Sequence, residues 1–404
     1  MYRTRGRGPI GVLSLTMGVG IIGCGYWGPN LIRAFQDCEG AFVAAVCDID
    51  LDRLVRVSRL YPTIRGFQRP EDLFDRPDVR LVAIATPLAS HFELAKAAIQ
   101  RGKHVLVEKP FTRSSSEAEE LIDLAGKQGV MLAVDHTFLF TPAVEKIKEL
   151  IGSGRLGRLH YIDSVRINLG LIREELDVVW DLAPHDLSIV DYLLGRLPIR
   201  VVATGRSHNE TGRTDVVYIN LDYGDGVMVN FHLSWLSPVK VRRMILGGDR
   251  RMIIYDDLSS NEKVRVYDRG IMTSGRADKG GRLERIDYRE GDIWTPHLSP
   301  KEALAVQAEH LVAAIRLGAP LRADGASGLR VVRLLEACTK SLEEDGIRIV
   351  PANVPDAFGA VSLPADSLAP SVRHSEPVFA DASGLLFGPH APTETVRQEG
   401  AISR

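Results

Sequence analysis

Hydrophobic and polar residues follow two different patterns along the chain, and the first pattern covers residues 17–137. Short apolar runs typical of buried strands stand at 19–22, 41–46, 81–85, 104–107 and 130–134. Segments with helical spacing separate these runs, at 29–38, 51–61, 71–74, 91–101 and 115–128. Repeated strand and helix units of this kind predict a parallel sheet that is covered by helices on both faces. We therefore expect an α/β domain in this part of the chain.

The second pattern begins at residue 138, where predicted strands follow one another with little helix between them. A helix at 142–151 precedes strands at 161–168, 200–205, 216–221, 227–235, 242–246 and 252–255, and helices at about 300–317 and 328–344 close the series. Runs of strands after α/β units predict an α+β domain over 138–350, with a large, mostly antiparallel open sheet. We expect residues 1–16 to be a disordered extension and the Pro-rich residues 351–404 to be a mobile tail. The sequence is compatible with a translation start at Met1 or at Met17.

Composition and charge exclude several classes of protein. The chain has 404 residues, 45% of them hydrophobic and 25% charged, with a formal net charge of −2. It therefore has no bulk attraction to nucleic acid or to an anionic membrane. Residues 1–16 fit neither a secretory signal nor a membrane span. The four cysteines form no CxxC pair and no Cys/His cluster, so we expect reduced thiols, no metal site and a cytoplasmic location.

The strongest chemical signal is a glycine pattern directly after the first apolar run. Gly23, Gly25 and Gly28 form G-x-G-x-x-G, in which the glycines permit a tight turn, a close approach to a pyrophosphate and close helix packing. This pattern predicts a Rossmann dinucleotide-binding domain. Asp48, at the end of the next strand, is placed to accept hydrogen bonds from the adenosine ribose, although alone it is equally well explained as a turn residue. It favours NAD over NADP because a carboxylate repels a 2′-phosphate and the nearest downstream base is Arg53.

A candidate catalytic lysine follows the apolar run at 104–107. Lys109 stands in Glu108-Lys109-Pro110, and ligands of open α/β sheets bind at the carboxyl ends of the strands. The lysine is therefore placed to hydrogen-bond a reacting oxygen and to help move its proton. The bond before Pro110 is a candidate cis peptide. The alternative, a surface lysine in a loop, is disfavoured by the position at a strand end.

A second candidate cluster lies in Trp180-Asp181-Leu182-Ala183-Pro184-His185-Asp186. Asp181 and His185 are four residues apart and share one face of a helix, and we expect Pro184 in its first turn. A carboxylate one turn from an imidazole orients it and raises its basicity, which suits a general base. An N-cap aspartate beside a partly buried histidine explains the spacing equally well.

Basic residues further along the chain are weaker candidates. Arg166, Asn168 and Arg173 precede the Asp181 helix and could face a diphosphate or a uronate, or be solvated. Neighbouring Arg242 and Arg243 point to opposite faces of an expected strand, so at most one of them serves a ligand. For the cluster that they form with Lys240 we expect a solvated sheet face.

The order of these motifs resembles the Gfo/Idh/MocA oxidoreductases over residues 17–350. The resemblance rests on the glycine pattern, on Ala85-Thr86-Pro87 with His91, on Glu108-Lys109-Pro110 and on Asp181-x-x-x-His185. It implies that Lys109 and His185 flank the reacting hydroxyl and that Asp181 supports them. It also implies that Thr86 and Glu108 lie near the nicotinamide half of the cofactor. The cofactor site is further expected to include Tyr26, Trp27 and His91.

The resemblance extends to members that act on UDP-N-acetylhexosamines or their uronates. It is carried by residues 23–30, 166–170 and 180–186, and it implies NAD-dependent oxidation of a secondary hydroxyl, at C3, in a homodimer or homotetramer. Two other enzyme functions stay open: an NADPH-dependent ketoreductase of a keto-deoxysugar nucleotide, and an inositol or free-sugar dehydrogenase. A non-catalytic, dinucleotide-sensing regulator is the alternative from a different class.

Overall fold

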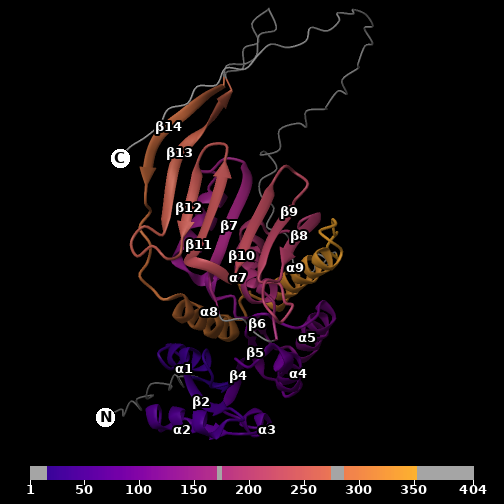
Figure 1. Ribbon diagram of the computed structural model, residues 1–404. Coiled ribbons are helices and arrows are strands. Elements are labelled where there is room, and N and C mark those ends of the chain that lie inside the picture. Colours follow the sequence, from indigo (N-terminus) through magenta and orange to yellow (C-terminus); the bar gives the residue numbers. More distant parts are fainter. Residues whose placement is uncertain (1–15, 171–174, 274–285, 353–404) are drawn as a thin grey trace, which may run out of the picture. The chain divides into compact units, whose positions relative to one another are not determined.

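The computed structural model describes residues 16–170, 175–273 and 286–352, and its first sheet has six parallel strands (Figure 1). Their order is β3-β2-β1-β4-β5-β6, and all neighbouring pairs run parallel. The strands are β1 (Met17–Ile22), β2 (Ala41–Cys47), β3 (Arg65–Phe67), β4 (Val79–Ile84), β5 (His104–Val107) and β6 (Leu132–Val134). The sheet confirms the predicted α/β fold. The strand order reverses between β1 and β4, which places a binding crevice at their carboxyl ends.

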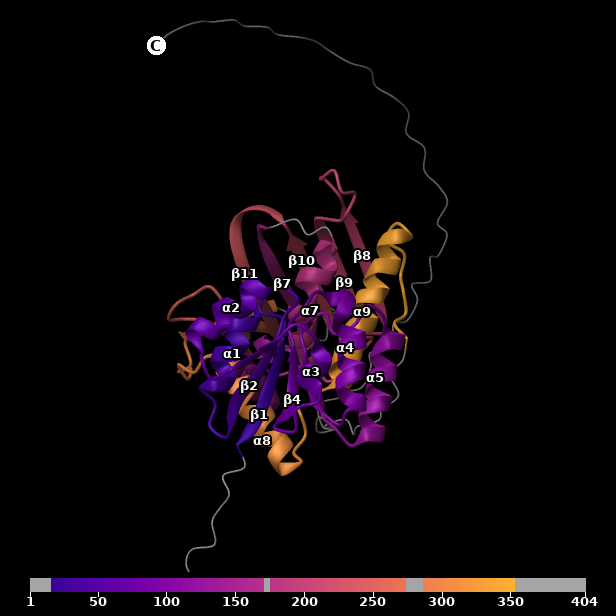
Figure 2. The same ribbon diagram turned by 90° about the horizontal axis from the view of Figure 1, so that it is seen from below.

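Helices cover both faces of this sheet. The helices of this part of the chain are α1 (Gly28–Gln36), α2 (Leu51–Leu60), α3 (Pro70–Phe74), α4 (His91–Gln100) and α5 (Ser115–Gln128). Figure 2 shows α1 and α2 on one side of the strands and α3, α4 and α5 on the other. Ser114 caps α5 by accepting a hydrogen bond from the Glu117 amide, as the capping-box pattern predicts.

The helix α8 (Ala303–Leu317) packs where the sequence did not predict it. We expected this segment to close the second domain. Its buried residues Leu304 and Leu311 instead share a core with Phe35 of α1, and Arg33 and Glu302 form an ion pair at 2.7 Å beside it. An apolar stripe shows that a helix is covered on one side but carries no information about which sheet covers it.

The second sheet has eight strands in the order β14-β13-β12-β11-β7-β10-β9-β8. They are β7 (Leu159–Leu169), β8 (Arg200–Arg206), β9 (Val216–Asp222), β10 (Met228–Ser234), β11 (Leu236–Gly248), β12 (Met252–Asp256), β13 (Val264–Thr273) and β14 (Ile286–Trp294). β10 and β7 are parallel and the other pairs are antiparallel. The sheet confirms the predicted mostly antiparallel α+β arrangement. We did not predict β13 and β14, which lie at one edge and interrupt their apolar positions with Asp, Arg and Gly.

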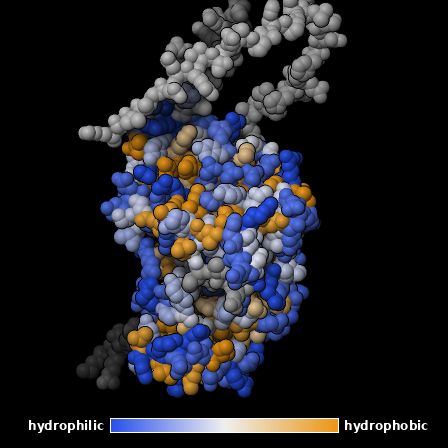
Figure 3. Space-filling model, in the orientation of Figure 1, coloured by the Kyte–Doolittle hydropathy of each residue, from blue (hydrophilic) through white to orange (hydrophobic). Residues whose placement is uncertain are grey.

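One face of the second sheet is covered by α6 (Pro142–Gly152), α7 (Val178–Leu194) and α9 (Gly325–Glu343). Inward residues of alternate strand positions, such as Ile219, Phe231 and Leu246, form the core beneath them. The opposite face carries exposed Tyr218 and Met228, and Figure 3 shows apolar surface among polar surface over this part of the molecule. Across the described ranges, no helix has both the length and the apolar character needed to span a membrane.

Candidate active site

A cleft of 1700 Å³ opens at the carboxyl ends of the first sheet's strands. Its wall includes the loops after β1, β4, β5 and β6, the face of α7 and part of β11. Pockets for a single small ligand measure about 300–1,000 Å³. The cleft therefore has room for a dinucleotide and a second sizeable molecule side by side.

The glycine turn after β1 has the shape that a pyrophosphate site requires. Gly23 has a φ of +95°, and a Cβ there would lie 2.5 Å from the Ala85 carbonyl oxygen. A Cβ on Gly28 would lie 2.0 Å from the Gly23 carbonyl oxygen, so neither position accepts a side chain. A Cβ on Gly25, by contrast, would meet only the Arg53 guanidinium, at 3.6 Å. The backbone at Gly25 is thus open to the cleft, as close approach by a phosphate demands.

The N-terminus of α1 adds an electrostatic reason for an anion to bind here. Trp27, its N-cap residue, makes no capping hydrogen bond with its side chain, and the first turn contains no acidic residue. The Gly28 amide and the positive end of the helix dipole are therefore placed to attract a phosphate. Pro29 lies in the first turn, as predicted.

Asp48 is buried at the end of β2, beside the glycine turn. Its carboxylate accepts hydrogen bonds from the amides of Cys24, at 2.7 Å, and Asp50, at 2.9 Å. Arg53 Nη1 lies 3.5 Å from Asp48 Oδ2. This cation is closer to the carboxylate than the sequence indicated, and it offsets part of the repulsion that Asp48 exerts on a 2′-phosphate.

His91 joins two of the loops that line the cleft. Its Nδ1 lies 2.9 Å from the Pro110 carbonyl oxygen and its Nε2 lies 2.9 Å from that of Thr86, and the ring is buried. Ser90 donates a further hydrogen bond to the Thr86 hydroxyl at 2.7 Å. His91 thus holds the loop after β4 against the loop after β5, whose Lys109–Pro110 peptide bond is cis.

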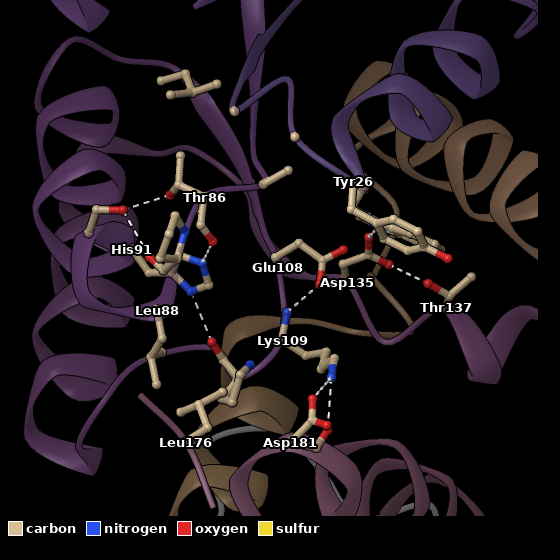
Figure 4. Close-up of a pocket in the computed structure, with 18 of the residues that line it drawn as sticks. Tyr26, Thr86, Leu88, His91, Glu108, Lys109, Asp135, Thr137, Leu176 and Asp181 are labelled. Atoms are coloured by element: carbon tan, nitrogen blue, oxygen red, sulfur yellow. Dashed lines mark hydrogen bonds and ion pairs between the residues drawn. The ribbon is translucent and has the colours of Figure 1, made fainter. Parts of the chain in front are cut away.

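Glu108 and Asp135 form a carboxyl pair near the same place (Figure 4). Burial, and then the neighbouring Asp135 carboxyl, raises the pKa of Glu108 well above its usual range. Asp135 accepts hydrogen bonds from Trp27 Nε1 at 2.8 Å and from the Thr137 hydroxyl at 2.6 Å. Glu108 therefore keeps its proton at pH values where an ordinary carboxyl is ionised. Tyr26 is 92% exposed and lines the same cleft.

The sequence did not point to Asp135 and Thr137 as site residues. Both follow β6, which lies beside β5 in the sheet. The carboxyl ends of parallel strands meet at one edge of the sheet, where ligands bind. The residues directly after the apolar run that ends at Val134 could therefore have been predicted as site residues. His136, between them, is buried with both ring nitrogens unpartnered among the described residues, and burial lowers its pKa to about 4.

The tertiary structure brings Lys109 and Asp181 together (Figure 4). Lys109 Nζ donates to the Asp181 carbonyl oxygen at 2.8 Å and lies 3.4 Å from Asp181 Oδ1. The other carboxylate oxygen accepts from Trp235 Nε1 at 3.3 Å. Asp181 therefore orients the lysine head group in the cleft.

The helix that carries Asp181 begins earlier than predicted. α7 is capped by Asp177, which accepts a hydrogen bond from the Trp180 amide, and Pro184 lies inside the helix rather than in its first turn. An internal proline cannot donate to the carbonyl four residues before it, which here is the carbonyl of Trp180. The Asp181 carbonyl, the next one along the helix, accepts from Lys109 Nζ.

Replacing Pro184 with alanine should therefore stabilise the protein and leave the site intact. We expect the free energy of unfolding to rise by about 1 kcal/mol, because an amide at position 184 can donate to the Trp180 carbonyl. We expect kcat to stay within about twofold of wild type, because the Asp181 carbonyl keeps its contact with Lys109. Thermal unfolding and steady-state kinetics test both effects. A marked fall in kcat would show that the proline positions the site residues of α7.

His185 lines the cleft beside the ring of Phe138, which it meets edge-on with centroids 5.1 Å apart. Burial lowers the pKa of His185 well below its usual value, and the positive charges of Lys109, Arg166 and Arg242 lower it further. The expectation that Asp181 raises the basicity of His185 is therefore wrong in direction. The imidazole is uncharged at neutral pH and is ready to accept a proton.

The three predicted substrate residues differ in their positions relative to the cleft. Arg166 is buried and donates to Asp186 through Nε at 3.0 Å and Nη2 at 2.7 Å. It does not line the cleft, so the structure does not support a direct contact with substrate. Asn168 does line the cleft, and Arg173 lies outside the described residues.

The β11 residues correct a further expectation. Lys240 and Arg242 both line the cleft, whereas we expected a solvated sheet face. Arg243 points away from it and pairs with Asp256 at 2.9 Å. The alternation of side chains along a strand made one of the two arginines a candidate, but it could not show which face the cleft occupies.

Comparisons with known proteins match both parts of the chain to one family. Residues 17–136 match the model of the "oxidoreductase family, NAD-binding Rossmann fold", and residues 144–254 match that of the "GFO/IDH/MocA C-terminal domain". The UDP-N-acetylglucosamine 3-dehydrogenase of Acidithiobacillus ferrooxidans is 29% identical over 78% of this chain and 94% of its own. The scyllo-inositol 2-dehydrogenase (NADP(+)) of Bacillus subtilis is 28% identical over 81% of this chain and 94% of its own.

A solved structure extends the likeness to three dimensions. A structure of the Acidithiobacillus ferrooxidans enzyme superposes with a TM-score of 0.68 at 26% identity, over 81% of this chain and 98% of that one. The two family models together span more than half of the chain, and the cleft has the dinucleotide turn and the lysine that the motifs predicted. The chain belongs to the Gfo/Idh/MocA family of oxidoreductases, the NAD(P)-dependent dehydrogenases that act on hydroxyl groups.

Proposed function

We propose that this protein oxidises a secondary hydroxyl, at C3, of a UDP-N-acetylhexosamine or its uronate, with NAD as the acceptor. The observation that carries the proposal is the placement of Lys109 by Asp181 in the same cleft as the uncharged His185. The cleft volume of 1700 Å³ suits a substrate as large as a nucleotide sugar. The similarity to a UDP-N-acetylglucosamine 3-dehydrogenase supports this substrate class.

His185 and Lys109 divide the proton chemistry in this proposal. When bound, the nicotinamide supplies the acceptor for a hydride. His185 removes the hydroxyl proton as the hydride leaves, because its imidazole is uncharged. Lys109 donates a hydrogen bond to the oxygen and stabilises its developing negative charge, while Asp181 holds the ammonium in place.

The preference for NAD rests on Asp48. Its buried carboxylate lies beside the glycine turn, where the adenosine ribose of a dinucleotide binds. Arg53 Nη1, 3.5 Å from that carboxylate, weakens the discrimination. We therefore expect NADP to be used as well, at a lower kcat/KM than NAD.

A screen of reduced cofactor formation tests the proposed function. The wild-type protein is assayed with NAD and with NADP against UDP-N-acetylhexosamines, UDP-uronates, dTDP-sugars and inositols. We expect the highest kcat/KM for a UDP-N-acetylhexosamine or its uronate with NAD. A preference for inositols would make it a polyol dehydrogenase. NADPH consumption with a keto-deoxysugar nucleotide would make it a ketoreductase, and binding of dinucleotide without any turnover would indicate a regulator.

We also propose that the protein acts as a homodimer or homotetramer through the uncovered face of the second sheet. Tyr218 stacks on His232 with centroids 4.5 Å apart, and Tyr218 and Met228 are 56% and 49% exposed. Exposed apolar groups on one sheet face are typical of a contact surface. Light scattering gives the mass in solution, and a value of 44.4 kDa, that of one chain, would contradict this proposal.

A further inference from the structure

Strand β11 contributes two cationic side chains to the wall of the cleft. Lys240 and Arg242 both line the cleft, as does His185. Arg242 lies over the ring of Phe138, with its guanidinium carbon 6.0 Å from the centroid. The same ring meets His185 edge-on. Arg242 is therefore close to the proposed reacting centre, and Lys240 stands two residues before it on the same strand.

The positive charge at this place is only partly neutralised. Arg242 has one carboxylate partner among the described residues, Asp257, at 3.4 Å. That carboxylate also faces Lys263, at 3.5 Å, and accepts a hydrogen bond from the Tyr255 hydroxyl. For Lys240 the described part of the chain offers neither an ion pair nor a side-chain hydrogen bond, so cations outnumber anions here.

A third cation, on the neighbouring strand β7, adds to the electrostatic repulsion that Arg242 experiences. Arg242 on β11 stands directly opposite Arg166 on β7, and the Phe138 ring lies 4.7 Å from the Arg166 guanidinium carbon. Like charges directly opposite each other destabilise a sheet. Arg166 is neutralised by the two hydrogen bonds that it donates to Asp186, whereas Arg242 shares Asp257 with Lys263. Uncompensated charge of this kind is characteristic of functional sites.

We propose that Lys240 and Arg242 form a subsite for an oxyanion group of the substrate, either a carboxylate on the sugar or the diphosphate that links it to the nucleoside. The subsite rests on the proposed function and sharpens it. The chain selects substrates that carry negative charge next to the reacting sugar, and it disfavours neutral polyols. An arginine guanidinium and a lysine ammonium are the groups that bind such oxyanions in proteins.

The subsite also affects the chemical step. The charge of Arg242 is one of the causes that lower the pKa of His185. An anion bound to Arg242 offsets that charge, so His185 becomes a stronger base when the correct substrate is present. A neutral substrate brings no such compensation. The subsite should therefore act on kcat as well as on KM.

Charge removal on β11 tests the subsite. The variants are Arg242→Gln, Lys240→Gln and the double variant, with Arg243→Gln as the matched control on the other face of the same strand. Steady-state kinetics are measured with UDP-N-acetylglucosamine, with its uronate and with the uncharged myo-inositol, and NAD affinity reports that the fold is intact. We expect kcat/KM for the anionic substrates to fall about 10- to 100-fold in each single variant. The Arg243→Gln control should stay within about twofold of wild type with every substrate, and the reaction of the other variants with myo-inositol should not fall, because a neutral substrate does not use the subsite.

The same experiment distinguishes the two possible oxyanions, the sugar carboxylate and the diphosphate. A loss confined to the uronate assigns the subsite to the sugar carboxylate. An equal loss for both nucleotide sugars assigns it to the diphosphate, and the affinity for UDP alone, measured by calorimetry, should then fall as well.

The subsite and the proposed function fail in different ways. A double variant that matches wild type with both nucleotide sugars overturns the subsite and leaves the function standing. A wild-type protein that oxidises no nucleotide sugar overturns the function. In that case calorimetry with UDP and with UDP-N-acetylglucosaminuronate still tests the subsite, and equal affinities in the wild type and the double variant overturn it.

Discussion

Replacing Lys109 with methionine should lower kcat for the preferred substrate about 10³-fold and leave the dissociation constant of NAD within about twofold. The ammonium group is held by Asp181 at 2.8 Å and 3.4 Å and lines the cleft. A positioned group that moves or stabilises a proton contributes about 10²- to 10⁴-fold. Methionine keeps most of the side-chain volume, so the change removes the charge without opening a cavity. Steady-state kinetics and a fluorescence titration with NAD measure the two quantities.

Lys127→Met is the matched control for this substitution. Lys127 is exposed in the last turn of α5 and does not line the cleft, so its loss should leave kcat and NAD affinity unchanged. A Lys109 variant with wild-type kcat would remove Lys109 from the mechanism. A variant that loses NAD affinity to the same extent as kcat would place the lysine in cofactor binding rather than in the chemical step.

The pH profile of kcat/KM should identify His185 as the proton acceptor. The reaction requires the uncharged imidazole, so kcat/KM rises with pH through the pKa of His185 and is constant above it. Burial and the surrounding cations lower that pKa well below its usual value, so the wild-type protein should be fully active at pH 6.5 and lose activity only at more acidic pH. In His185→Ala the acidic limb should disappear, and the remaining kcat should be lower by about 10²- to 10⁴-fold.

The opposite assignment of the two basic groups gives a different profile. If Lys109 accepts the proton, activity follows the deprotonated lysine instead of the imidazole. The pH dependence of kcat/KM then persists in His185→Ala. The pKa of Glu108, also in the cleft, is raised well above its usual range by burial and then by Asp135, so the profile of Glu108→Gln serves as the control for an acidic limb that comes from this carboxyl.

Features that depend on neighbouring residues along the chain could be predicted from the sequence. The glycine turn, Pro29 in the first turn of α1 and the capping of α5 by Ser114 appear in the structure where the pattern placed them. Lys109 could be located in the same way. An apolar run predicts a buried strand, and ligands of parallel sheets bind where the strands end. These inferences require only the local conformation and the direction of one strand.

The pairing of charged groups could not be predicted, because it depends on segments that are distant in the sequence. The spacing of Asp181 and His185 placed both on one helix face, but the carboxylate orients Lys109, which is 72 residues away. The sequence pattern made Arg166 a candidate for the substrate site and placed Arg242 on a solvated sheet face. The structure shows the reverse, because Asp186 neutralises Arg166 outside the cleft and Arg242 lines the cleft.

The sequence by itself thus determined the dinucleotide turn, the two sheets and the position of the lysine at a strand end, because backbone conformation is set by residues close together in the chain. The tertiary structure alone decided what each charged group does. It placed α8 against α1, brought Lys109 to Asp181 and turned Lys240 and Arg242 toward the cleft. The electrostatic effect of a charge depends on its distance from other charges and on its burial, and both are properties of the folded chain.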